Sequence, residues 1–176
     1  SILFTHCQSL GKTFIDPNSN PIIMSEKREA EFWRTADDGR IECLLCPHHC
    51  KIPMGGSGLC RARANEGKRL VAEGYGTYPA VHMDPIEKKP LNHFLPGSNI
   101  LSLGSVGCNL TCLHCQNWSL ARGSPEGLDG YYLSLENLLS KASGKGSIGV
   151  AFTYNEPTIN YEYIMDAGKK LKAQGS

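Results

Sequence analysis

The fold of this chain is best predicted from one stretch of its sequence, Asn99-Ile100-Leu101-Ser102-Leu103-Gly104-Ser105-Val106-Gly107-Cys108-Asn109-Leu110-Thr111-Cys112-Leu113-His114-Cys115. Its first residues form a short apolar run that is typical of a buried strand. Three cysteines with C-x3-C-x2-C spacing follow in the next loop. In α/β folds, working sites lie on the loops that leave the carboxyl ends of strands. We therefore expect a functional site directly after this strand.

The sequence that follows predicts a helix, a strand and a second helix. Leu133–Ala142 is expected to be helical with Ser134 as its N-cap, and Ile148–Thr153 to be a second buried strand. After Pro157, one apolar stripe recurs every four residues, at Ile159, Tyr163, Ala167 and Leu171. This order indicates an α/β fold with a parallel sheet. A complete eightfold barrel takes ~250 residues, so we expect only the start of a partial (β/α) barrel, cut short by the end of the chain.

The residues before this unit are expected to form two further regions. Residues 1–24 form an irregular segment rich in turn residues. Residues 25–97 form an N-terminal region, in which Glu26–Asp37 is expected to be helical. Arg40–Arg63 is expected to fold around a metal rather than as a sheet. Residues 98–176 are expected to form the incomplete barrel.

Composition excludes several classes of protein. The 176 residues are 40% hydrophobic and 20% charged, which is typical of a globular chain and not of a disordered one. The formal net charge of +1 argues against a nucleic-acid-binding protein. No apolar run approaches the ~20 residues of a membrane-spanning helix. We therefore expect a cytoplasmic protein that does not bind membranes.

Seven of the eight cysteines fall into two groups. The upstream group is Cys43, Cys46, Cys50 and Cys60, and the downstream group is Cys108, Cys112 and Cys115. Cys7 stands alone and is expected to be a free thiol. Close spacing in a chain without an evident secretion signal favours metal binding over disulfides.

The downstream group fits an iron–sulfur cluster better than zinc. Structural zinc takes four ligands, and adjacent His114 and Cys115 would be awkward to aim at one ion. Iron–sulfur clusters are held by thiolates, and three of them leave one iron of a cubane open. Chemistry can take place at this open iron.

At this point the sequence resembles radical S-adenosylmethionine (radical SAM) enzymes. The resemblance implies that Cys108, Cys112 and Cys115 bind a 4Fe-4S cluster, and that S-adenosylmethionine (SAM) chelates the open iron. A Gly-Gly-Glu-like motif ends the second strand in that superfamily and contacts the SAM amino group. The sequence here has Asn155 and Glu156 at that place but lacks the glycines. The resemblance assigns SAM contact to Glu156 and Asn155; alternatively, this segment only ends a strand and caps a helix.

Further motifs narrow the resemblance. Cys43–Cys50, Gly58–Arg61, Asp84–Leu91 and Cys115–Trp118 look like the radical SAM member of the AmmeMemoRadiSam system, a group similar to the activating enzymes of glycyl-radical enzymes. The match runs from about Glu31 to the C-terminus. It implies reductive cleavage of SAM to a 5′-deoxyadenosyl radical, a flavodoxin- or ferredoxin-like electron donor, and an unidentified substrate that could be a protein. The alternatives are an inactive truncated relative and a zinc-binding interaction module.

The upstream group allows three interpretations. Cys43, Cys46, Cys50 and Cys60 could close a structural zinc site or hold an auxiliary iron–sulfur cluster. Cys43 and Cys46 could also form a redox-active dithiol. Spacing alone does not choose among them.

Overall fold

The computed structural model describes residues 27–125, 132–144 and 146–173. Within them the elements are, in order, β1 (Trp33–Thr35), β2 (Ile41–Cys43), β3 (Lys51–Ile52), β4 (Arg63–Asn65), β5 (Leu70–Ala72), β6 (Ala80–Pro85), the 3-10 helix η1 (Ile86–Lys88), β7 (Asn99–Gly104), α1 (Trp118–Arg122), α2 (Leu135–Ala142), β8 (Ser147–Phe152), the 3-10 helix η2 (Pro157–Asn160) and α3 (Tyr161–Ala173). The predictions for residues 1–24 and for Cys7 lie outside the described residues.

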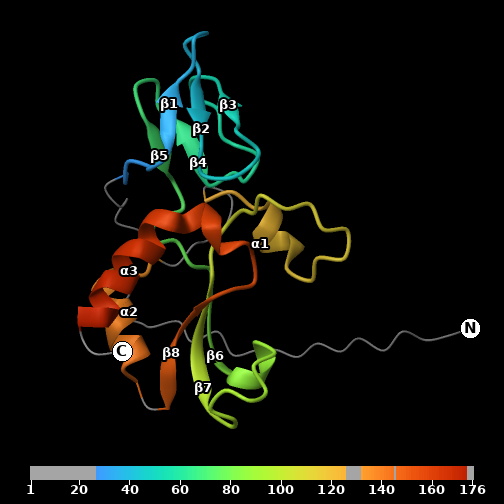
Figure 1. The fold of residues 1–176 in the computed structure, drawn as a ribbon, viewed down its shortest axis with the longest axis vertical. Helices are drawn as coiled ribbons and strands as arrows, with labels where there is room; N and C mark the ends of the chain where they lie inside the picture. Colours follow the sequence, from blue (N-terminus) through green and yellow to red (C-terminus); the bar gives the residue numbers. More distant parts are fainter. Residues whose placement is uncertain (1–26, 126–131, 145, 174–176) are drawn as a thin grey trace, which may run out of the picture.

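The first part of the described chain is a small β module. β1, β2 and β3 form one antiparallel sheet, and β4 pairs with β5 in a second. These sheets lie together at one end of the molecule (Figure 1). Their shared core is apolar and consists of Ala30, Ile41, Cys43, Ile52, Leu70 and Ala72. The module is therefore held by its own small hydrophobic core.

Two sequence predictions for this module are wrong. The predicted helix Glu26–Asp37 contains strand β1, whose Trp33 lies opposite Cys43. Phe32 has φ 56°, a left-handed conformation that a continuous right-handed helix does not contain. The region Arg40–Arg63 was expected to contain no sheet, yet it supplies β2 and β3. In both cases pairing between strands overrides the local pattern, since short strands are stabilised by their partners.

The second part is a three-stranded sheet packed against helices. β6 pairs antiparallel with β7, and β7 pairs parallel with β8. α2 and α3 lie along one side of this sheet (Figure 1). Ser134 caps α2 by accepting a hydrogen bond from Asn137 N at 3.1 Å. The buried core between sheet and helices consists of Tyr78, Leu101, Leu103, Leu133, Leu138, Ala142, Tyr163 and Ala167.

The predicted strands and helices of this part exist, but the predicted barrel does not. β7, β8, α2 and α3 agree with the expected order. The described residues nevertheless form three small sheets with few helices and no partial barrel. The reason is that β6 pairs antiparallel with β7 and so occupies the edge of β7 that does not face β8. A strand has only two edges for hydrogen bonding, so a barrel of parallel strands cannot extend from that side.

The two parts are joined by a buried ion pair. Arg63 begins β4, and Glu162 lies in the first turn of α3. Their side chains are 1% and 0% exposed, respectively, and they make two hydrogen bonds of 2.9 Å. This pair fixes the β module on α3, above the carboxyl ends of β7 and β8 (Figure 1). No helix in the described ranges is long and apolar enough to cross a membrane.

Candidate functional site

The downstream cysteines lie in the loop between β7 and α1. Cys108 is buried, Cys115 is partly buried and Cys112 is exposed. Despite these differences, all three border one cavity of about 200 Å³. Its full lining is Cys108, Leu110, Cys112, Cys115, Trp118, Ala121, Arg122, Tyr154, Asn155 and Glu156. The structure therefore brings together all five residues that the sequence predicts for cluster and SAM binding. His114 is exposed and does not line the cavity.

The start of the cysteine loop is fixed by contacts with the β module. Gly107 has φ 88°, and a Cβ atom there would collide with the carbonyl oxygen of Cys60. The backbone N–H of Cys108 donates a hydrogen bond to this same oxygen at 3.2 Å. Glycine is required here for both reasons, the left-handed backbone and the close approach. The loop thus starts in direct contact with the turn that carries Cys60.

Asn155 holds the cysteine loop from the opposite side. Its side-chain amide donates hydrogen bonds to Ser105 Oγ at 2.9 Å and to the Gly107 carbonyl oxygen at 2.7 Å. Asn117, at the other end of the loop, donates to the Tyr154 carbonyl oxygen at 2.9 Å. The segment after β8 therefore braces both ends of the loop. Asn155 lines the cavity, but its amide hydrogens already have partners.

Glu156 has a structural role as well as a place in the cavity wall. It is the N-cap of η2, and its Oε1 accepts hydrogen bonds from Thr158 N at 3.1 Å and Thr158 Oγ1 at 2.6 Å. Capping was the alternative explanation of this motif, and the structure contains it. Glu156 still lines the same cavity as the three cysteines. Its second carboxylate oxygen is not used in the cap.

Sequence reasoning missed three charged or aromatic contributors to this site, namely Trp118, Arg122 and Tyr154. Arg122, at the end of α1, lines the cavity and donates to the Leu110 carbonyl oxygen at 3.1 Å. Tyr154 also lines it, with an unusual φ of 69°. A terminal arginine of a five-residue helix has no sequence signal. The position of Tyr154 depends on a contact with Asp84, which is 70 residues away in the sequence.

Tyr154 is held by a buried carboxylate. Its hydroxyl donates to Asp84 Oδ2 at 2.6 Å, and Lys88 and Lys89 donate to the same carboxylate at 2.9 and 2.7 Å. Burial opposes ionisation of Asp84, but these hydrogen bonds outweigh it and hold its pKa well below the usual range. Burial, followed by the bond to Asp84, raises the pKa of Tyr154 well above its usual value. Tyr154, an aromatic part of the cavity wall, is therefore held in place by the charged carboxylate of Asp84.

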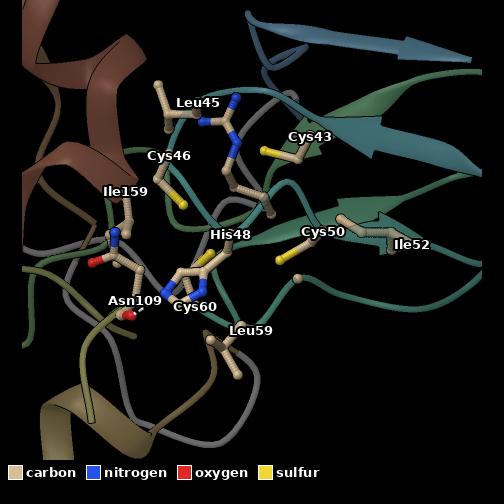
Figure 2. Close-up of a pocket in the computed structure, with 12 residues that line it drawn as sticks. Cys43, Leu45, Cys46, His48, Cys50, Ile52, Leu59, Cys60, Asn109 and Ile159 are labelled. Atoms are coloured by element: carbon tan, nitrogen blue, oxygen red, sulfur yellow. Dashed lines mark hydrogen bonds between the residues drawn. The ribbon is translucent and has the colours of Figure 1, made fainter.

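The upstream cysteines surround a second, much smaller cavity. All four of these cysteines line it, as Figure 2 shows. The volume of this cavity is only about 10 Å³. Burial raises the pKa of the Cys60 thiol to about 11. His48 also lines the cavity, but its Nε2 hydrogen-bonds to the Asn109 carbonyl oxygen at 2.8 Å. Because a carbonyl oxygen only accepts, Nε2 is the donor in this bond.

Neither cysteine group is a formed metal site. The seven cysteines of the described ranges are all free thiols. Within those ranges, no three His, Cys, Asp or Glu side chains are grouped closely enough to hold a metal ion. What the structure provides is two sets of thiols, each of which lines its own cavity. Disulfide bonds are absent from both sets.

Comparison with known proteins adds one finding. The chain is 39% identical over 148 residues to the uncharacterized protein MJ0808 of Methanocaldococcus jannaschii, a match that covers 84% of this chain. The chain spans 44% of that protein's length. No protein-family model matches the chain, and no solved structure matches it. Because this relative is named only as uncharacterized, the resemblance to radical SAM enzymes stays a prediction.

Proposed function

We propose that the chain binds a 4Fe-4S cluster through Cys108, Cys112 and Cys115 and belongs to a cytoplasmic radical SAM enzyme. One observation carries this proposal: the three thiols and both predicted SAM-contacting residues line a single cavity of about 200 Å³. Structural zinc sites take four ligands that are cysteines or histidines, and the cavity offers three thiols and no histidine. Three thiolates suit a cluster with one open iron.

The remaining wall of the cavity fits the amino-acid end of SAM. The methionine part of SAM carries an ammonium and a carboxylate. Glu156 and Arg122 line the cavity with one negative and one positive charge. The free carboxylate oxygen of Glu156 can accept from the ammonium, and the guanidinium of Arg122 can donate to the carboxylate. Trp118 and Tyr154 add aromatic surface against which bound SAM can pack and exclude water.

The sulfur of Cys108 is itself hydrogen-bonded. The backbone N–H of Leu110 donates to Cys108 Sγ at 3.4 Å. Hydrogen bonds to sulfur are among the factors that set the potential of iron–sulfur clusters. A cluster held by Cys108, Cys112 and Cys115 would supply the one-electron chemistry by which SAM is cleaved to methionine and a 5′-deoxyadenosyl radical for hydrogen abstraction from the substrate. A flavodoxin- or ferredoxin-like protein is the proposed electron donor, and the substrate is unidentified.

The test is anaerobic reconstitution with iron and sulfide. Bound iron and sulfide are quantified, and methionine and 5′-deoxyadenosine are measured after addition of SAM and dithionite. We expect four irons and four sulfides at the downstream group and SAM-dependent release of 5′-deoxyadenosine. Cys112→Ser should lose both, whereas Cys7→Ser, which alters a cysteine outside both groups, should lose neither. Equal iron content in wild type and Cys112→Ser would contradict cluster binding; a full cluster without cleavage would contradict the proposed activity of this chain.

A further inference from the structure

The upstream cysteines come from the end of β2 and from two neighbouring loops of the β module. Cys43 ends β2, Cys50 directly precedes β3, and Cys46 lies in the loop between them. Cys60 lies in the next turn, before β4. Figure 2 shows the four side chains around one space, from opposite sides. Four thiols brought together by separate turns match the ligand number of a structural zinc site.

The size of the cavity favours the binding of one metal ion over the binding of a cluster. At about 10 Å³ it has room for at most about one water molecule. The downstream cavity, by comparison, measures about 200 Å³. A cubane of four irons and four sulfides is far larger than one water molecule. A single zinc ion requires no such space, because it sits at the centre of its ligands with zinc–sulfur bonds of ~2.3 Å.

The surroundings of the cavity suit a closed structural site. Its other walls include apolar side chains, namely Leu45, Ile52 and Ile159. Arg63 also lines it, and its Nε is a buried N–H with no acceptor in the described part of the chain. A buried donor beside thiolates can hydrogen-bond to sulfur and offset their negative charge. In the described part of the chain, the hydrogen bonds of Arg63 come from its two Nη atoms.

The backbone of both loops is strained beside the thiols. His49, directly before Cys50, has φ 44°, and Arg61, directly after Cys60, has φ 61°. Both are non-glycine residues in the left-handed region, which is sparsely populated and persists only where surrounding structure determines it. In each case the left-handed residue stands next to a cysteine of this group.

We propose that Cys43, Cys46, Cys50 and Cys60 hold a single structural zinc ion. The inference does not depend on the proposed radical SAM function. The sulfurs are not grouped tightly enough to form the site as they stand, so the side chains must turn inward, and the free energy of zinc binding drives this. The site also supports the downstream loop. The Cys60 carbonyl oxygen accepts from Cys108 N at 3.2 Å, and His48 donates to Asn109 O at 2.8 Å.

The first test is metal analysis of the purified chain, without reconstitution, by mass spectrometry. We expect one zinc per chain in wild type, in Cys112→Ser and in Cys7→Ser, and loss of zinc in Cys46→Ser. Zinc that is lost in Cys112→Ser but kept in Cys46→Ser would overturn the assignment. So would wild type that contains no zinc after expression in zinc-supplemented medium. If the downstream group binds no cluster, these results do not change, because cluster binding is tested by iron content and this site by zinc content.

Cobalt substitution covers the case in which Cys46→Ser does not fold. Cobalt(II) is added to wild-type chain from which metal has been removed under reducing conditions, and the visible spectrum is recorded. A tetrahedral site of four thiolates gives intense ligand-field bands and a thiolate-to-cobalt charge-transfer band, which an equivalent of zinc should abolish. Weak bands of octahedral cobalt, or iron bound at this site after reconstitution of Cys112→Ser, would overturn the proposal.

Discussion

Arg63 and Glu162 form a fully buried, two-bonded ion pair between the β module and α3, with both hydrogen bonds at 2.9 Å. Glu162 also accepts from the backbone N–H of Glu31 at 2.7 Å, and Arg63 donates to the Glu31 carbonyl oxygen at 2.6 Å. One carboxylate and one guanidinium therefore join three segments. The pair lies next to the cavity of the upstream cysteines, which Arg63 lines.

Removal of one member of this pair should strongly destabilise the fold. Arg63→Met leaves a buried carboxylate without its partner, which typically costs about 3–5 kcal/mol of the free energy of unfolding. Urea unfolding followed by circular dichroism measures it. Lys170→Met, which removes an exposed pair with Glu136, is the matched control and should change stability little. Similar losses in both variants would show that the buried pair does not join the two parts.

Replacement of the carboxylate that holds Tyr154 should change the response of the protein to acid. The folded-state pKa of Asp84 lies below its unfolded value, so its contribution to stability is present above about pH 4 and is lost as pH falls. Asp84→Asn should therefore lower stability at neutral pH and lessen the loss of stability in acid. Urea unfolding across this pH range checks both. Asp37→Asn, at an exposed turn, is the control. Parallel stability curves for wild type and Asp84→Asn would contradict the account.

Gly107→Ala should disturb the contact between the two cysteine groups. Gly107 and Gly39 both have left-handed backbones, with φ 88° and 79°. Alanine at either position incurs the conformational cost of about 1–2 kcal/mol. Only at Gly107 does the new methyl group also meet a backbone oxygen, that of Cys60; at Gly39 no atom lies within 4 Å. Thermal unfolding should therefore show a larger loss for Gly107→Ala, and equal losses would disprove close contact.

Arg122→Gln should weaken SAM binding to the reconstituted protein about tenfold, since a charge-assisted hydrogen bond contributes ~1.5 kcal/mol. Equilibrium dialysis with labelled SAM gives the dissociation constant. Arg40→Gln removes an exposed arginine that pairs with Asp38 and should leave binding unchanged. An affinity for SAM that is the same in Arg122→Gln and wild type would exclude Arg122 from the site.

Local pattern predicted the second half of the fold better than the first. The apolar run of β7, the cap at Ser134 and the four-residue stripe of α3 are local signals, and the structure contains each element. β1, β2 and β3 are only two or three residues long and depend on their partners. The barrel prediction was wrong for a related reason. Whether β6 pairs with β7 is a property of the assembled sheet, which no single run of residues records.

In the candidate site too, residues with a local sequence signal were predicted, and residues placed by contacts elsewhere in the fold were not. Cysteine spacing and the place of Asn155 and Glu156 after a strand were readable from the sequence, and these residues do line one cavity. Arg122 and Tyr154 could not be predicted from the sequence, since Arg122 is held by the Leu110 carbonyl oxygen and Tyr154 by Asp84. At the upstream group, the small volume of the cavity is what favours one ion over a cluster. Spacing carries no such information.

The most direct test of the central claim is electron paramagnetic resonance of the anaerobically reconstituted, reduced protein, recorded with and without SAM. If Cys108, Cys112 and Cys115 hold a cluster with an open iron, the reduced protein gives a cluster signal that shifts when SAM is added. Cys112→Ser should abolish this shift, and Cys7→Ser, which alters a cysteine outside both groups, should preserve it. A cluster signal that is indifferent to SAM, or no cluster signal at all, would contradict the account.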